Sequence, residues 1–117
     1  MLYKLFLRLK LMDIYKDIEI IELLDIYGKL LTERQLEILK MYYNYDISLS
    51  EIAENFYITR QGVRDCLIKC RKLLTDYEDK LNLQKKNKTI NSYLDKIINE
   101  TDLNIIKQTT EKLKNEI

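Results

Sequence analysis

The sequence has no histidine, no proline and only two glycines among its 117 residues. A β-rich fold of this length needs many tight turns, and such turns usually recruit glycine and proline. The composition therefore favours an all-α protein. The sequence also lacks a glycine-rich phosphate loop and a plausible nucleophile with a base partner, so we expect a protein that is not an enzyme and needs no cofactor.

Cysteine is scarce as well, with only Cys66 and Cys70, four residues apart in a helical pattern. Helical i, i+4 geometry suits a disulfide poorly, and a metal site would need more ligands than two thiols in a chain without histidine. We interpret the pair as small apolar core residues in a reducing compartment and expect no metal site.

The opening, MLYKLFLRLKL, is apolar but is interrupted by three basic residues. It lacks the cleavage site of a signal peptide, and it is too short and too charged to span a bilayer. We expect no membrane insertion and a cytoplasmic location. Our hypothesis is that Met12 is the natural start, which divides the chain into an extension that is not native (1–11), a helix-turn-helix domain (12–81) and a C-terminal helical extension (82–117).

Apolar residues recur at helical spacing along most of the chain. Gly28 stands where a left-handed turn would end the first helix. The segments TERQ (32–35) and SLSE (48–51) are typical of capping boxes that open further helices. Residues 82–88 (NLQKKNK) are polar and basic and predict a hinge, with two more helices beyond it. The apolar stripe expected in the first helix comprises Ile14, Ile18, Ile21 and Leu24; the stripe expected after Thr59 comprises Val63, Leu67, Cys70, Leu74, Tyr77 and Leu81.

The segment from Ser48 to Leu74 meets the requirements of a helix-turn-helix. Ala53 is small where the two helices would cross closely, and Ile58 is apolar where the turn must be pinned to the core. Thr59 is placed to cap the second helix, and Val63 would face inward one turn later. Because these four residues all stand at the spacing that the motif requires, the sequence predicts a helix-turn-helix.

The second helix of the motif would carry the exposed side chains that contact double-stranded DNA. Arginine and glutamine can form paired hydrogen bonds to guanine and adenine edges, and a helix N-terminus can hold a phosphate. Asp65 argues against tight binding, because it would lie near phosphates, and some helix-turn-helix motifs contact proteins instead. The candidate DNA-binding residues are Thr59, Arg60, Gln61, Arg64, Lys69, Arg71 and Lys72.

The formal net charge is only +1, so no strong field of the whole molecule steers it toward nucleic acid. Residues 48–74 carry five basic and three acidic residues, whereas residues 12–47 carry four basic and eight acidic residues. Positive charge is therefore weakly concentrated in the motif.

The stretch YGKLLTERQLEILKMYYNYDISLSEIAENFYITRQGVRDCLIKCRKLLTDYEDKL closely resembles the YlxM family of small bacterial helix-turn-helix proteins. The resemblance runs from about Asp25 to Leu81. It departs from the family pattern at Thr59, Gly62 and Arg64, where serine, alanine and an aromatic residue are usual. It implies a three- to four-helix core of the winged-helix or sigma-region-four kind, and a regulatory role associated with the signal recognition particle pathway.

We therefore predict a regulatory DNA-binding protein that reads the major groove with residues 59–71. The alternative is an adaptor that contacts protein or RNA components of the targeting machinery and uses the motif as a scaffold. The apolar seam from Leu74 to Leu81 and the C-terminal helices lead us to expect a homodimer.

Overall fold

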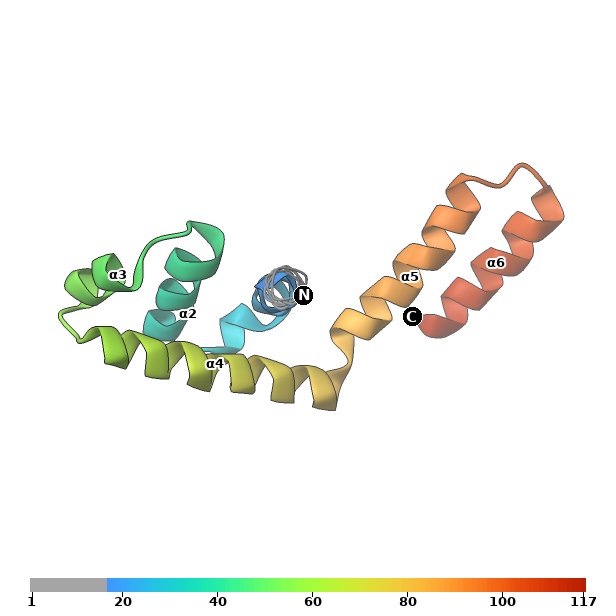
Figure 1. Ribbon diagram of the computed structural model, residues 1–117. Helices are drawn as coiled ribbons and strands as arrows, with labels where there is room; N and C mark the ends of the chain where they lie inside the picture. Colours follow the sequence, from blue (N-terminus) through green and yellow to red (C-terminus); the bar gives the residue numbers. More distant parts are fainter. Residues whose placement is uncertain (1–16) are drawn as a thin grey trace, which may run out of the picture. The chain divides into compact units, whose positions relative to one another are not determined.

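The computed structural model describes residues 17–117, so the predictions made for residues 1–11, Met12 and Ile14 lie outside the described part. All regular structure between residues 17 and 117 is helical, and this range contains no strand (Figure 1). The all-α prediction is confirmed, and the motif carries no β-wing in this range. The chain divides between Lys80 and Leu81 into two compact units.

The first unit holds the helix-turn-helix and its supporting helices. A helix over residues 17–27 continues into the 3₁₀ turn η1 (Gly28–Leu30). The short helix α2 (Glu33–Leu39) runs into one π-helical turn, η2 (Lys40–Asn44). The two helices of the motif are α3 (Leu49–Phe56) and α4 (Arg60–Leu81).

The predicted capping box at the start of α2 is confirmed. Thr32 Oγ1 accepts from the Gln35 N–H at 3.2 Å, and Gln35 Oε1 accepts from the Thr32 N–H at 3.0 Å. At α3, Ser48 Oγ accepts from the Glu51 N–H at 3.2 Å, which supplies the serine half of the second predicted box. These local bonds fix where both helices begin.

The predicted inner face of the first helix is wrong. Ile18 is 48% exposed and Ile21 is exposed too, whereas Leu24 is buried. The residues that enter the core are Ile20, Leu23, Leu24 and Tyr27. These follow the i, i+3, i+4, i+7 spacing of one helix face. Isoleucines occupy both faces of this helix, and the periodicity alone did not decide between them.

Gly28 does not form the predicted left-handed turn, because no glycine of the described chain has a positive φ. It is buried inside η1, and a Cβ there would lie 2.9 Å from Leu36 Cδ1 and 3.6 Å from Leu24 Cδ1. Because glycine has no Cβ, the backbone at Gly28 can pack closely against these two leucines. Gly28 is therefore needed for this close packing and not for a left-handed backbone.

The 22-residue helix α4 buries its stripe against its own unit. Val63, Leu67, Cys70 and Leu74 are all buried, as predicted, and Leu81 is exposed. Beyond Leu74, the ring of Tyr77 lies 6.0 Å from the ring of Tyr27. The apolar seam from Leu74 to Leu81 was expected to pair with a second copy of the chain. The helix over residues 17–27 covers this seam as far as Tyr77, so that part of the seam is not available to a second copy.

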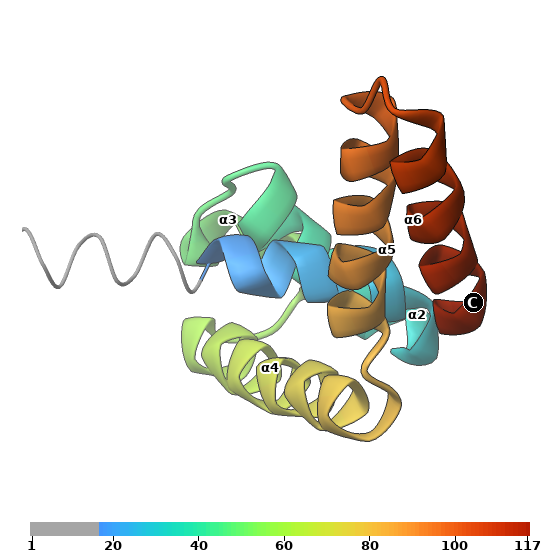
Figure 2. The same ribbon diagram turned by 90° about the vertical axis from the view of Figure 1, so that its right-hand side faces the viewer.

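The second unit is a pair of antiparallel helices, α5 (Leu83–Ile98) and α6 (Leu103–Glu116), which lie side by side (Figures 1 and 2). Between α4 and α5 only Asn82 leaves the helix, with φ 54°, so residues 83–88 are helical and the predicted hinge over 82–88 is wrong beyond Asn82. Thr109 and Leu113 are buried between the helices. Among the helices of residues 17–117, none has the length and apolar character needed to cross a membrane.

Candidate nucleic-acid interface

The turn between α3 and α4 is built as the sequence predicted. Ile58, half-buried against the core, donates its N–H to the Ala53 carbonyl at 3.0 Å. Thr59 Oγ1 accepts from the Gly62 N–H at 3.0 Å and so caps α4. Val63 behind it is fully buried. The turn is thereby tied to the core, and α4 begins at the surface.

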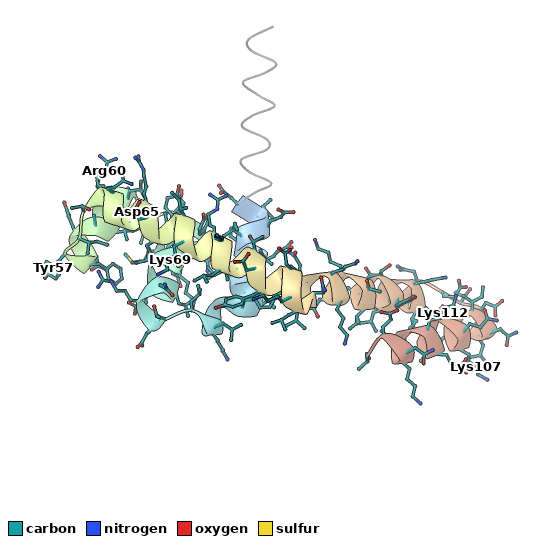
Figure 3. The ribbon with its side chains drawn as sticks, turned by 90° about the horizontal axis from the view of Figure 1, so that it is seen from below. Tyr57, Arg60, Asp65, Lys69, Lys107 and Lys112 are labelled. Atoms are coloured by element: carbon teal, nitrogen blue, oxygen red, sulfur yellow. The ribbon has the colours of Figure 1, made fainter. Side chains whose placement is uncertain are left out.

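The residue that makes the sharp turn is Tyr57, whose backbone is left-handed with φ 56° and ψ 40°. Glycine or asparagine usually occupies this position at the end of a helix. The Tyr57 side chain is 96% exposed. Figure 3 shows Tyr57 and Arg60 at the same end of α4, with Asp65 and Lys69 farther along the helix.

The exposed surface of α4 has an outer ridge directly opposite its buried stripe, as the 3.6-residue repeat requires. This outer ridge consists of Gln61, Asp65, Ile68 and Lys72, all exposed. Gln61 Nε2 donates to Asp65 Oδ1 at 2.9 Å. Ile68 remains 66% exposed although it is apolar. The ridge is therefore close to neutral and mixes amide, carboxylate and apolar groups.

One flank of α4, which we call the tyrosine-side flank, carries the arginines. A hollow of about 270 Å³ is lined there by Arg64 and Arg71 together with Tyr42 and Tyr43 from η2. The two tyrosine rings meet edge to face, with centroids 4.9 Å apart. Burial raises the pKa of the Tyr43 hydroxyl above its ordinary value, and the adjacent Arg71 guanidinium, which hydrogen-bonds to it, opposes this rise. Arginine and tyrosine thus form one continuous surface.

The other flank, which we call the α2-side flank, faces the start of α2. A groove of about 460 Å³ is lined there by Arg34 and Gln35 on one side and by Asp65, Cys66 and Lys69 on the other, among others. The Arg34 guanidinium carbon lies 5.8 Å from the centre of the Phe56 ring, within the range of a cation–π contact. A cation from α2 therefore stands across the groove from Lys69 of α4.

The structure separates the seven predicted DNA-binding residues into two groups. Thr59, Arg60, Gln61, Arg64 and Lys69 lie on the first half of α4 and its cap, and all five are exposed. Arg71 and Lys72 lie farther along and line a third hollow, of about 370 Å³, together with Glu19 and Asp76. That hollow holds two acidic side chains and the α2-side groove holds one, Asp65, while Arg71 also lines the tyrosine-side hollow beside Arg64.

Three residues on the flanks, Arg34, Tyr42 and Tyr43, were not predicted as part of the site. Arg34 comes from the helix before the motif, and no local pattern connects it to Lys69. The two adjacent tyrosines belong to η2, a π-helical turn, and such turns are frequent at functional sites. No pattern in the sequence predicts that turn, so this signal is visible only in the structure.

Comparisons with known proteins agree with this architecture. Residues 14–117 match the family described as "Putative helix-turn-helix protein, YlxM / p13 like". A UPF0122 protein of Clostridium kluyveri is 56% identical over 68 residues, which are 58% of this chain and 61% of that protein. A UPF0122 protein of Desulforamulus reducens is 46% identical over 78 residues, which are 67% of each chain.

The match to the Clostridium kluyveri protein thus spans less than two thirds of that relative's length. The family match, in contrast, extends over both compact units of the described chain. Together with the observed helix-turn-helix, it places this chain in the family of YlxM/p13-like helix-turn-helix proteins.

Proposed function

We propose that this protein is a regulator that binds double-stranded DNA through the exposed first half of α4. The observation that carries the proposal is the exposure of Arg60 and Arg64 on the second helix of a helix-turn-helix, clear of the core. In such motifs the start of the second helix enters the major groove. We propose no catalytic activity, and a regulator of this kind acts in the cytoplasm.

The distribution of charge around α4 supports a duplex as the partner. A helix in the major groove has one phosphate backbone on each side of it and base edges in front. Cations line both flanks of α4, with Arg64 on the tyrosine-side flank and Arg34 and Lys69 on the α2-side flank. The nearly neutral outer ridge then faces the bases.

The outer ridge carries groups that can read base edges. The Gln61 amide can pair with adenine, and the Asp65 carboxylate can accept from the amino group of cytosine. The exposed Ile68 can contact a thymine methyl group. Asp65, which argues against phosphate contact, is thereby consistent with a position in the groove.

The experiment that tests the proposal is a salt titration of duplex binding. We expect fluorescence anisotropy with random and promoter-derived duplexes to show binding at 50 mM salt that weakens linearly on logarithmic scales as salt rises. Arg60→Ala and Arg64→Ala should each weaken binding about tenfold, and a lost phosphate contact should lower the slope by about one.

Lys80→Ala is the matched control, because it removes the same charge from the far end of α4, about 30 Å along the helix axis from Arg60. This exposed lysine should contribute little to affinity. Equal effects of Lys80→Ala and Arg60→Ala, or no salt-dependent binding by the unmodified protein, would refute the proposal.

The second candidate function is an adaptor that contacts protein or RNA of the targeting machinery. The net charge of +1, the acidic residues beside Arg71 and Lys72, and the exposed Ile68 favour it. The link to the signal recognition particle pathway comes from the family resemblance. Pull-down from native cells with no nuclease, with DNase or with RNase tests it, because DNase leaves a protein or RNA partner of an adaptor in place and removes what a DNA-binding protein holds, and RNase then distinguishes an RNA partner from a protein.

We further propose that the protein is a homodimer formed by the second unit. Two helices of this size bury too little apolar surface to be stable alone. Four large apolar side chains of the pair stay exposed: Ile98 at 77%, Ile117 at 78%, Leu94 and Leu103. Two such pairs can complete a four-helix bundle around a two-fold axis.

A further inference from the structure

We infer that the side chain of Tyr57 contacts the phosphodiester backbone of the DNA that the proposed function assigns to α4. This inference rests on the proposed function and adds to it a contact from the α3–α4 turn. The exposed cations of α4 account for DNA binding in general, whereas three properties of Tyr57 itself point to this contact: its backbone, its exposure and its position.

Tyr57 occupies a backbone conformation that disfavours it. With φ 56° and ψ 40°, its Cβ crowds the following carbonyl oxygen, a penalty that glycine avoids. Three non-glycine residues of the described chain have positive φ, and the other two are Asp46 and Asn82. Those residue types tolerate this region well, and an aromatic residue does not.

The left-handed turn lets the backbone N–H groups of Tyr57 and Ile58 bond to carbonyls of α3, but the Tyr57 side chain adds nothing that a glycine there would lack. At 96% exposure, the Tyr57 ring packs on almost nothing in its own chain. It is the most exposed of the large apolar residues in the described part. A strained backbone that carries an unpacked aromatic side chain is a pattern found where a side chain serves a partner.

The position of Tyr57 favours contact with the sugar-phosphate backbone of the DNA over contact with the base edges. Tyr57 precedes Arg60 by three residues and lies with it at the end of α4 that would enter the groove (Figure 3). It belongs to the turn and not to the outer ridge, so it lies beside the groove. A tyrosine hydroxyl can donate to a phosphate oxygen, and the ring can lie against the adjoining sugar.

The test compares stability and duplex binding in the same variants of the full chain. Tyr57→Gly should raise the melting temperature by a few degrees, because it relieves the left-handed backbone, and should weaken binding of a random 20-base-pair duplex at 50 mM salt about fivefold. Tyr57→Asn should behave in the same way. Tyr57→Phe keeps the ring and the backbone penalty, so it should leave the melting temperature unchanged and weaken binding to a smaller degree.

Tyr45→Ala is the control for loss of an exposed tyrosine, since Tyr45 is 69% exposed, has a negative φ and lies at the end of η2. It should leave duplex affinity unchanged. If Tyr57→Gly and Tyr57→Asn bind the duplex as tightly as the unmodified protein while Arg60→Ala binds weakly, the inference fails and the proposed function stands. If the unmodified protein shows no salt-dependent duplex binding, both fail.

Discussion

Cys70 is a titratable residue inside the apolar core. Its side chain is fully buried in α4, with its sulfur 4.0 Å from the sulfur of Cys66. Burial, reinforced by the neighbouring thiol, raises the pKa of Cys70 from about 9 to about 12. A thiol held neutral in this way is a poor nucleophile and a poor metal ligand, which agrees with its interpretation as a core residue.

This shift predicts a loss of stability at alkaline pH. Between pH 9 and pH 12 the unfolded chain releases the Cys70 proton and the folded chain keeps it, so the free energy of unfolding falls as pH rises. One such group contributes a slope of up to about 1.4 kcal/mol per pH unit. Denaturant unfolding of the unmodified protein at pH 8.5, 9.5 and 10.5 should therefore show a steeper decline than that of Cys70→Ala.

Tyrosines and lysines titrate in the same range, and the comparison between variants cancels their common effect. Cys66→Ala, which keeps the Cys70 thiol, should retain most of the steeper decline. Parallel declines for the unmodified protein and Cys70→Ala would mean that Cys70 is not shielded from solvent as the structure has it.

At the scale of single residues, the sequence predicts what depends on neighbours along the chain. The caps at Thr32, Ser48 and Thr59 are correct, because a cap is a bond between residues three apart. Gly28 was assigned the wrong role, since its contact with Leu36 requires the fold. The left-handed backbone of Tyr57 was not predicted at all, because nothing in the local pattern marks a tyrosine for that conformation.

At the scale of elements, a polar contact joins the helix over residues 17–27 to the second half of α4. Tyr27 Oη donates to Glu78 Oε1 at 2.8 Å, and the Tyr27 ring stacks at a tilt on Tyr77. Through this contact, the helix over residues 17–27 packs on the part of α4 that extends beyond the helix-turn-helix. It explains how α4 reaches 22 residues without leaving Leu74 and Tyr77 in water.

Removal of this hydroxyl should loosen the packing of the two helices. Tyr27→Phe keeps the ring and loses a hydrogen bond to a carboxylate, which costs about 1.5 kcal/mol. Chemical denaturation measures this loss, and a double-mutant cycle with Glu78→Gln isolates the pairwise part from other contacts of either residue. Tyr45→Phe, at an exposed site, is the control, and an equal effect of the two tyrosine changes would contradict the structure.

The elements were predicted better than their faces. The helices after Thr32, Ser48 and Thr59 lie where the sequence placed them, because capping and periodicity agree there. The first helix has isoleucines on both sides, so only packing against α4 decides that Ile20 rather than Ile21 faces inward. For the same reason the flanks of the candidate interface were missed, since each combines residues of α4 with residues of α2 or η2.

At the scale of the whole molecule, DNA affinity and dimer formation should depend on each other. A net charge of +1 gives little general attraction to DNA. α4 carries six basic and four acidic side chains, a net charge of only +2, so a single copy should bind weakly. A dimer that presents two α4 helices to two half-sites gains from the second contact through effective concentration.

Leu94→Glu combined with Ile98→Glu therefore tests both ideas in one molecule. These two exposed apolar residues lie four positions apart on one face of α5, so their replacement should leave the helix-turn-helix folded and convert dimers to monomers. Duplex affinity should then fall at least tenfold. Ser92→Glu combined with Lys96→Gln makes the same change of charge on another side of α5 and should keep the dimer and most of the affinity. Sedimentation velocity measures the dimer, and anisotropy measures duplex affinity, in both double variants. If the added negative charge alone weakens binding, both variants lose affinity. If loss of the dimer weakens binding, only the variant with Leu94→Glu and Ile98→Glu loses affinity.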